Sequence, residues 1–153
     1  MDRDRHTLDP LHLIRETAAR ASVAVGLGGI GLIHLLDSIG KYDETRYLFW
    51  MYVALILGSL AAAGAVLFSR ARLPLLAAAG LAASALTGYV LSRTTGLPNA
   101  TGDIGNWTEP LGLASLFVEG AVVAAALGAY AILPATSKTT ARRLHAVELA
   151  EAA

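Results

Sequence analysis

The chain has 153 residues, of which 55% are hydrophobic and only 16% are charged, too apolar for an ordinary soluble domain of this size. Twelve Lys and Arg balance twelve Asp and Glu, so no basic field is available to attract a nucleic acid. The absence of cysteine excludes disulfides, thiolate metal ligands, iron–sulfur clusters and thiol catalysis. We therefore expect a small membrane protein that contacts the lipid bilayer and no nucleic acid.

The first twenty residues carry four arginines and several acids and have no apolar core, so we do not expect them to form a cleavable signal peptide. Asp9-Pro10 followed by Leu11, Leu13 and Ile14 is typical of a capped short helix at a membrane surface. The sequence thus predicts an N-terminal tail over residues 1–20 that contains a short interfacial helix.

Four apolar segments follow, and each is long enough to cross a bilayer, which takes about 20 helical residues. They cover approximately residues 21–39, 47–69, 73–92 and 110–133. The last two lack the lasting polar stripe that a soluble bundle needs. The predicted fold is all-α, an integral membrane four-helix bundle that forms one unit over residues 21–134, followed by a tail over residues 135–153.

The distribution of positive charge orients the predicted spans. Since cytoplasmic segments of membrane proteins carry an excess of Lys and Arg, both termini are predicted to be cytoplasmic and the loops over 40–46 and 93–109 to face outward. The outward loops hold three of the twelve Lys and Arg, namely Lys41, Arg46 and Arg93. The other nine lie on the opposite side, at Arg3, Arg5, Arg15, Arg20, Arg70, Arg72, Lys138, Arg142 and Arg143.

Small residues recur at every fourth position in the last two spans, a spacing that lets membrane helices approach closely. This pattern predicts close packing within the bundle or a face for a second copy or another membrane subunit. The residues are Gly80, Ser84 and Gly88, and Gly120, Ala124 and Gly128.

Three ionisable residues lie inside the spans or at their edges, where a charge costs roughly 2.5–3.5 kcal/mol at mid-membrane. They are His34, Asp37 and Glu119. At ~1.5 Å per residue, His34 lies about 9 Å and Glu119 about 14 Å below the outer boundary, so the two side chains can meet. We expect them to form one polar site in the outward half of the bundle.

A metal ion or haem is the first interpretation of this site. His34, Asp37 and Glu119, with Glu109 from the outer loop, offer the nitrogen and oxygen ligands that suit Zn, Cu(II) or non-haem Fe, and His34 could serve as the axial ligand of a haem. Glu109 can instead cap the helix that starts at Pro110, and Trp107 can anchor the interface. The residues expected around the ligands are Tyr52, Thr87, Tyr89, Arg93, Asp103 and Trp107.

Two other interpretations of the polar site stay open. A buried Glu near a His is what a proton or ion relay uses, although the inner half of the bundle offers few polar groups to continue the path. Alternatively, the residues tie the four helices together in a structural or accessory subunit that docks a partner. Enzymatic hydrolysis is disfavoured, because Ser115 has no second outward His as its base and the chain has no Gly-x-Ser-x-Gly turn.

Two stretches resemble a group of uncharacterised small four-span membrane proteins from high-GC actinobacteria. These are Ser92-Arg-Thr-Thr-Gly-Leu-Pro98 and Trp107-Thr-Glu-Pro-Leu-Gly-Leu-Ala-Ser-Leu-Phe-Val-Glu119, which match an Arg-Thr-x-Gly-Leu-Pro loop followed by a Trp and a helix with an internal Glu. The arrangement of four short spans is also similar to that of DoxX-type membrane proteins, at the level of fold only. The resemblance implies a bacterial cytoplasmic membrane and no particular activity.

Overall fold

The structure is a computed structural model that describes residues 10–133. Within this range, the chain folds into five helices and no named strand, which confirms the all-α prediction for the described part. Four of the helices are long and apolar enough to cross a membrane. The orientation of the termini stays a prediction, and the predicted C-terminal tail lies outside the described residues. The helices are α1 (Pro10–Asp37), α2 (Lys41–Glu44), α3 (Arg46–Phe68), α4 (Leu73–Thr94) and α5 (Pro110–Ile132).

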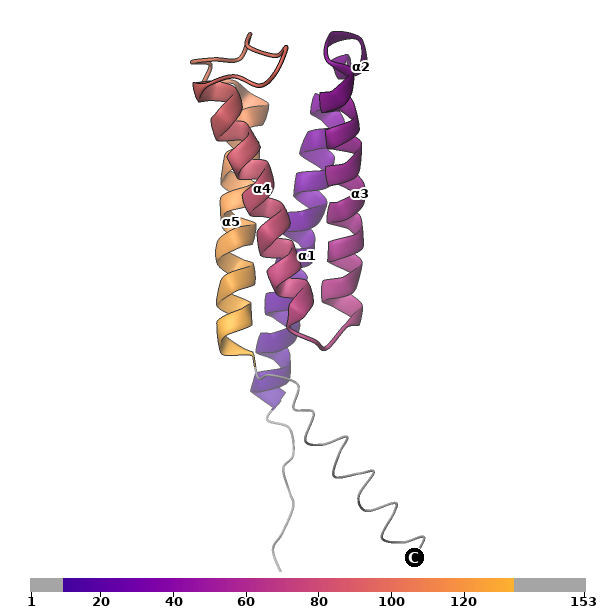
Figure 1. Ribbon diagram of the computed structural model, residues 1–153. Coiled ribbons are helices and arrows are strands. Elements are labelled where there is room, and N and C mark those ends of the chain that lie inside the picture. Colours follow the sequence, from indigo (N-terminus) through magenta and orange to yellow (C-terminus); the bar gives the residue numbers. More distant parts are fainter. Residues whose placement is uncertain (1–9, 134–153) are drawn as a thin grey trace, which may run out of the picture.

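The four long helices run side by side in one helical body (Figure 1). Helix α1 packs against α3 on one side and α5 on the other, and α4 packs mainly against α5, whereas α3 and α4 contact each other less extensively. The core lies where α1 meets the other three helices. Its fully buried side chains include Leu27, Ile30, Val66, Leu75 and Val122.

The start of α1 differs from the prediction. The described residues contain no separate interfacial helix before the first span, because α1 begins at Pro10 and continues without a break to Asp37. The prediction was wrong because it treated Arg20 as a marker of the aqueous tail, whereas the Arg20 side chain is buried inside the helical body. Asp9, the predicted cap, lies outside the described residues.

Close approach between helices occurs at other glycines than those predicted. A Cβ atom at Gly26 would collide with Val122, and one at Gly58 would lie 2.9 Å from a methyl carbon of Leu81. By contrast, a Cβ atom would meet nothing within 4 Å at Gly80, Gly88, Gly120 and Gly128. The prediction of close packing within the bundle at these four glycines was therefore wrong.

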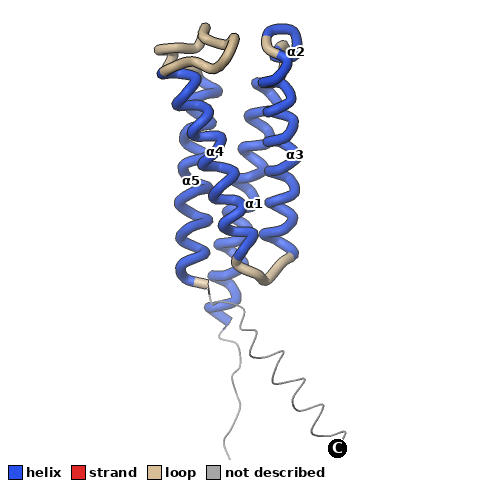
Figure 2. The backbone as a smooth tube through the Cα atoms, viewed as in Figure 1, coloured by secondary structure: helices blue, strands red, loops and turns tan. Residues whose placement is uncertain are grey.

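The helical body has two different ends, which we name by their connections (Figure 2). The turn end comprises residues 69–72, between α3 and α4, together with the end of α5. The loop end comprises residues 38–45, which include α2, and the longer loop 95–109.

Two arginines close the turn end by binding carbonyl groups at the ends of helices. Arg20 donates hydrogen bonds to the carbonyl oxygens of Val66, Ser69, Arg70 and Ala71 at 2.9–3.3 Å. These carbonyls belong to the last turn of α3 and to the turn that follows it. Carbonyl groups at a helix C-terminus have no intrahelical hydrogen-bond partner. A cation at a helix C-terminus also opposes the negative end of the helix dipole.

The second arginine serves α5 in the same way. Arg72 donates to the carbonyl oxygen of Tyr130, and its guanidinium carbon lies 4.2 Å from the centre of the Tyr130 ring. Neither α3 nor α5 has a basic residue in its own last turn, so each helix end is stabilised by an arginine from a different segment.

Candidate ligand-binding cavity

The loop end contains a cavity of about 1110 Å³ whose walls come from all four long helices and from loop 95–109. The residues of α4 that face the other helices show where the cavity begins. Leu75, Ala78 and Ala82 on this face are buried in the core, whereas Ala85 and Tyr89, further along the same face, line the cavity. Helices α3 and α4 thus pack with the core near the turn end and line opposite walls of a cavity near the loop end.

His34 and Glu119 meet at the inner end of this cavity, as the depth argument predicted. His34 Nε2 lies 3.7 Å from Glu119 Oε1, which also accepts a hydrogen bond of 2.5 Å from the Ser115 hydroxyl. His34 Nδ1 lies 2.9 Å from the carbonyl oxygen of Ile30, so Nδ1 carries the proton and Nε2 is the nitrogen free to exchange one.

Glu119 lies directly behind the cavity wall. Its side chain is fully buried and its Oε2 atom has no hydrogen-bond partner among the described residues. His34 and Ser115 line the cavity, and Glu119 does not. A proton on Glu119 can therefore reach the cavity only through these two neighbours or through a rearrangement of the wall.

Asp37 takes a different partner from His34, although both lie on one face of α1. The Asp37 carboxylate accepts a hydrogen bond of 2.7 Å from the Tyr52 hydroxyl on α3. The Tyr52 ring also packs edge-on against His34, with ring centres 5.2 Å apart. Tyr52 thus fixes both polar side chains of α1 from the neighbouring helix.

Lys41 contributes a positive charge to the same side of the cavity. Its ammonium group lies 3.0 Å from Glu44 Oε2. Burial lowers the pKa of Lys41, but the hydrogen bond to Glu44 and the negative charges of Glu44, Asp37 and Asp103 outweigh burial and raise the pKa above its usual value. Lys41 is therefore a protonated cation that already has a partner.

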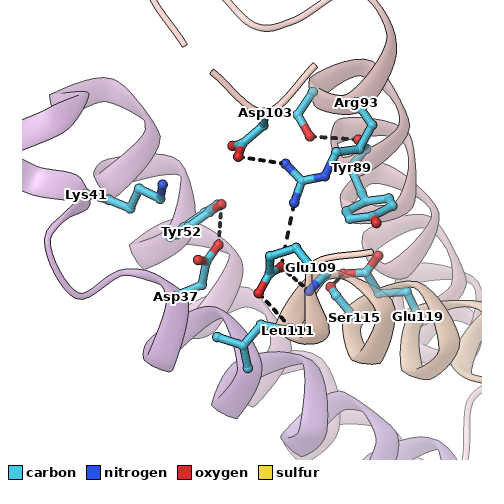
Figure 3. Close-up of polar contacts among 12 residues, drawn as sticks. Asp37, Lys41, Tyr52, Tyr89, Arg93, Asp103, Glu109, Leu111, Ser115 and Glu119 are labelled. Atoms are coloured by element: carbon cyan, nitrogen blue, oxygen red, sulfur yellow. Dashed lines mark hydrogen bonds and ion pairs between the residues drawn. The ribbon is translucent and has the colours of Figure 1, made fainter. Parts of the chain in front are cut away.

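Arg93 organises the opposite side of the cavity (Figure 3). Its guanidinium Nη1 lies 3.1 Å from Asp103 Oδ1 and its Nη2 lies 3.7 Å from Glu109 Oε2. The guanidinium carbon also lies 4.9 Å from the centre of the Tyr89 ring. Gly112 makes this cluster possible, because a Cβ atom there would lie 2.5 Å from a ring carbon of Tyr89 and 3.1 Å from Arg93 Nη2.

Glu109 caps α5, as one of the two sequence interpretations predicted. Its carboxylate accepts hydrogen bonds from the backbone nitrogens of Leu111 at 2.9 Å and Gly112 at 2.5 Å. A carboxylate at this position satisfies free N–H groups of the first turn and suits the positive end of the helix dipole. The same side chain links the start of α5 to Arg93 at the end of α4.

Loop 95–109 is a compact structure that continues the Arg93 cluster. Gly96, Asn99 and Gly105 adopt positive φ angles, which favour glycine and asparagine. The backbone nitrogen of Gly105 donates to the Arg93 carbonyl at 2.9 Å. Tyr47 on α3 donates to the Pro98 carbonyl at 2.7 Å, which ties the loop to the opposite side of the cavity.

The four predicted metal ligands are not brought to one point. His34 and Glu119 meet, but Asp37 turns to Tyr52, and Glu109 serves the α5 cap and Arg93. Within residues 10–133, no three His, Asp or Glu side chains lie close enough together to hold a metal ion. The sequence placed all four residues at one end of the body, but their local partners decide where each carboxylate points.

Two of the residues expected around the site lie away from the cavity. Thr87 is exposed and donates to the Ala83 carbonyl on its own helix. Trp107 is 42% exposed and packs edge-on against Tyr89, with ring centres 6.0 Å apart. The other expected residues, Tyr52, Tyr89, Arg93 and Asp103, all line the cavity.

The sequence analysis missed the roles of Ser115, Lys41 and Gly112. Ser115 lies four residues before Glu119, so helix periodicity places the two on one face, and this spacing was the available signal. Lys41 and Gly112 gave no such signal, because their roles depend on how α4, α5 and the two loop-end segments are arranged in space.

Comparison with known proteins found no family model, no curated protein and no solved structure that matches this chain.

Proposed function

We propose that this multi-pass membrane protein binds a small amphipathic organic molecule in the loop-end cavity. The observation that carries the proposal is the cavity itself, with its volume of about 1110 Å³ between α1, α3, α4 and α5. Ligand pockets in proteins usually measure about 300–1,000 Å³ and combine apolar walls with a few placed polar groups. The loop-end cavity matches this composition and has about this size.

The distribution of side chains supports a ligand with an apolar body and a polar group. Leu48, Met51 and Leu55 of α3 and Leu81 of α4 provide apolar wall. The polar groups belong to the Asp37–Tyr52 pair on one side and to the Arg93 cluster on the other. An amphipathic molecule would lay its apolar part between α3 and α4 and turn its polar part toward these groups.

The His34–Glu119 pair supports a second function, the exchange of a proton with the bound molecule. A carboxyl group that is fully buried, with one oxygen lacking a partner among the described residues, is costly to keep ionised in such surroundings. His34 lies between this carboxyl group and the cavity, and its Nε2 atom is free to accept a proton. Intramembrane hydrogen bonds average only ~0.6 kcal/mol, so stability alone is a poor reason for such a group.

A metal ion or a haem at this site has less support. Structural and catalytic zinc sites use three or four protein ligands, and His34 with Glu119 supplies two. The two other predicted ligands already have hydrogen-bond or ion-pair partners. A haem would need His34 Nε2, which faces Glu119 at 3.7 Å.

We also propose that the loop end faces outward from a bacterial cytoplasmic membrane. The support is the excess of Lys and Arg on the other side of the predicted spans, together with the resemblance to actinobacterial four-span proteins. In this orientation the cavity would take its ligand from the outer side of the membrane or from the outer leaflet.

Two glycine variants on α4 test the proposal. Gly88 lines the cavity and has room for a side chain, so Gly88→Leu fills part of the cavity without a collision at its Cβ atom. Gly80→Leu is the matched control, because Gly80 lies two turns earlier, is exposed, does not line the cavity and has equal room. Each full-length protein would be purified from membranes in mild detergent, and native mass spectrometry and metal analysis would measure what it carries.

We expect a small-molecule adduct on the wild type and on Gly80→Leu that is lost or at least tenfold depleted on Gly88→Leu. Lipids bound to the outside of the helices would be present equally on all three proteins. A wild type without an adduct, or an adduct that survives Gly88→Leu unchanged, would contradict the proposal and favour a structural role for the polar groups. One equivalent of zinc, copper, iron or haem on the wild type would favour the metal interpretation instead.

A further inference from the structure

The charges around the loop-end cavity do not balance. Its lining includes four carboxylates, from Asp37, Glu44, Asp103 and Glu109, but only two cationic side chains, Lys41 and Arg93. We propose that the ligand of this cavity is an organic cation whose positive group is held by Asp37. This inference rests on the proposed function, since it names the class of molecule that the same cavity would bind.

Both cationic side chains are already neutralised by neighbours. Lys41 pairs with Glu44 at 3.0 Å, and Arg93 pairs with Asp103 at 3.1 Å and with Glu109 at 3.7 Å. An anionic ligand would therefore have to displace a carboxylate from one of these ion pairs. The arrangement disfavours a phosphate, sulfate or carboxylate as the polar group of the ligand.

Asp37 is the cavity carboxylate without an ion pair, because Lys41, whose charge acts on it at longer range, is paired with Glu44. Within the described residues 10–133, no Lys, Arg or His nitrogen lies within ion-pair distance of its carboxylate, and its hydrogen bond comes from the neutral Tyr52 hydroxyl. Asp37 is half-buried, and a partly desolvated carboxylate is stabilised by a positive charge in direct contact with it. A bound cation would supply that charge.

The cavity offers a second and independent feature that suits an organic cation rather than a hydrated metal ion. Tyr52 provides aromatic wall beside Asp37, and organic cations bind favourably against aromatic rings, as Arg93 already does at Tyr89. Leu48, Leu55 and Leu81 provide apolar wall for the remainder of the molecule. A metal ion would find one carboxylate at Asp37 and no cluster of three ligating side chains within residues 10–133.

A pair of probes with the same shape and opposite charge tests the inference. Tetraphenylphosphonium is a cation, and tetraphenylborate is an anion of nearly the same size. Equilibrium binding of each probe would be measured on the full-length protein in the same neutral detergent, with empty micelles as the background. We expect tetraphenylphosphonium to bind at least tenfold more tightly than tetraphenylborate. Its affinity should fall in Gly88→Leu and stay unchanged in Gly80→Leu.

Two variants with the same charge change locate the site. Asp37→Asn should weaken tetraphenylphosphonium binding by about tenfold, since one close charge contact in a partly buried site is lost. Asp43→Asn is the control, because Asp43 lies at the same end of the molecule but is exposed and does not line the cavity. It should change the affinity by less than about twofold, because charges at an exposed position are screened by solvent and salt.

The outcomes separate this inference from the proposed function. Equal binding of the two probes, lost in both cases with Gly88→Leu, would overturn the preference for a cation and leave a ligand cavity in place. An affinity for tetraphenylphosphonium that is unchanged in Asp37→Asn would also overturn the inference. Failure of both probes to bind, with a native adduct that depends on Gly88, would overturn the inference alone, whereas failure of the probes and of any adduct would overturn both.

Discussion

The two ends of the helical body use arginine in opposite ways. At the turn end, Arg20 is 7% exposed and its terminal nitrogens bind only backbone carbonyls, which closes the gap between α1 and the end of α3. At the loop end, Arg93 is equally buried but binds the carboxylates of Asp103 and Glu109 at the rim of a cavity. One arginine completes helix ends, and the other shapes a binding surface.

Most of the buried polarity at the turn end caps helices, whereas the buried carboxyl group behind the cavity does not. At the turn end, Arg20 and Arg72 satisfy carbonyls that would otherwise have no partner, although Arg72 Nε itself is buried without a partner among the described residues. Behind the wall of the loop-end cavity, Glu119 Oε2 is buried without a partner among the described residues, and it belongs to a carboxyl group that caps no helix. Groups of this kind are retained at a cost in stability, which is expected of a site that serves a ligand.

The largest expected effect on stability comes from Arg20→Met at the turn end. The variant removes several charge-assisted hydrogen bonds from a buried position, and the free energy of unfolding should fall by about 2–4 kcal/mol. Unfolding in detergent by sodium dodecyl sulfate, followed by circular dichroism, would measure the loss. Arg15→Met is the control, since Arg15 lies on the same helix but is exposed. A loss under about 0.5 kcal/mol for Arg20→Met would show that the turn end does not depend on this cap.

Gly112→Ala should have the next largest effect, at the loop end. The added Cβ atom would push against Tyr89, Glu109 and Arg93, so the variant should lose about 1–3 kcal/mol of stability, as overpacked sites do, and should lose probe binding as well. Gly120→Ala on the same helix has open space around its Cβ atom and should be neutral or slightly stabilising. Equal stability and equal binding of the two variants would disprove the tight contact between α4 and α5.

The smallest expected effect is the contribution of Lys41 to the free energy of unfolding, which depends on pH. Its pKa is raised above the usual value of 10.5, so protonated Lys41 stabilises the folded protein below pH 10.5 and this contribution is lost as the pH rises through the folded-state value. The contribution should be under about 1 kcal/mol, because the partner Glu44 is 65% exposed and solvent screens the pair. In Lys41→Gln, the free energy of unfolding should change less between pH 10 and 12 than in the wild type. An unchanged pH dependence would show that the Lys41–Glu44 pair does not stabilise the fold.

The sequence predicted most of the fold because the bilayer imposes strong rules on composition. Three of the four predicted spans agree with α3, α4 and α5 to within two residues at each end. Helix α1, which holds the first span, begins at Pro10, eleven residues before the predicted span, and its candidate span begins at Leu13. Hydropathy alone cannot distinguish an arginine in water from one that binds carbonyl groups inside the helical body. Such a role for Arg20 depends on a turn some fifty residues away.

The candidate site was predictable only in part. Depth along each helix brought His34 and Glu119 together, because rise per residue is fixed by helix geometry. Depth along the helices could not predict the hydrogen bond between Asp37 and Tyr52, because this contact depends on how α3 is rotated about its axis relative to α1. The cavity was not predictable either, because it arises where α3 and α4 separate, and no local pattern in the chain encodes that separation.

Cysteine labelling tests directly whether the loop-end cavity is open to water while the core near the turn end is closed. The chain has no cysteine, so Ala85→Cys and Ala78→Cys each create one thiol on the same face of α4, two turns apart. Ala85 lines the cavity, whereas Ala78 is fully buried in the core. In membranes, a small water-soluble cationic methanethiosulfonate should modify Ala85→Cys at least tenfold faster than Ala78→Cys. Equal rates, or an unreactive Ala85→Cys, would show that the loop end holds no accessible cavity.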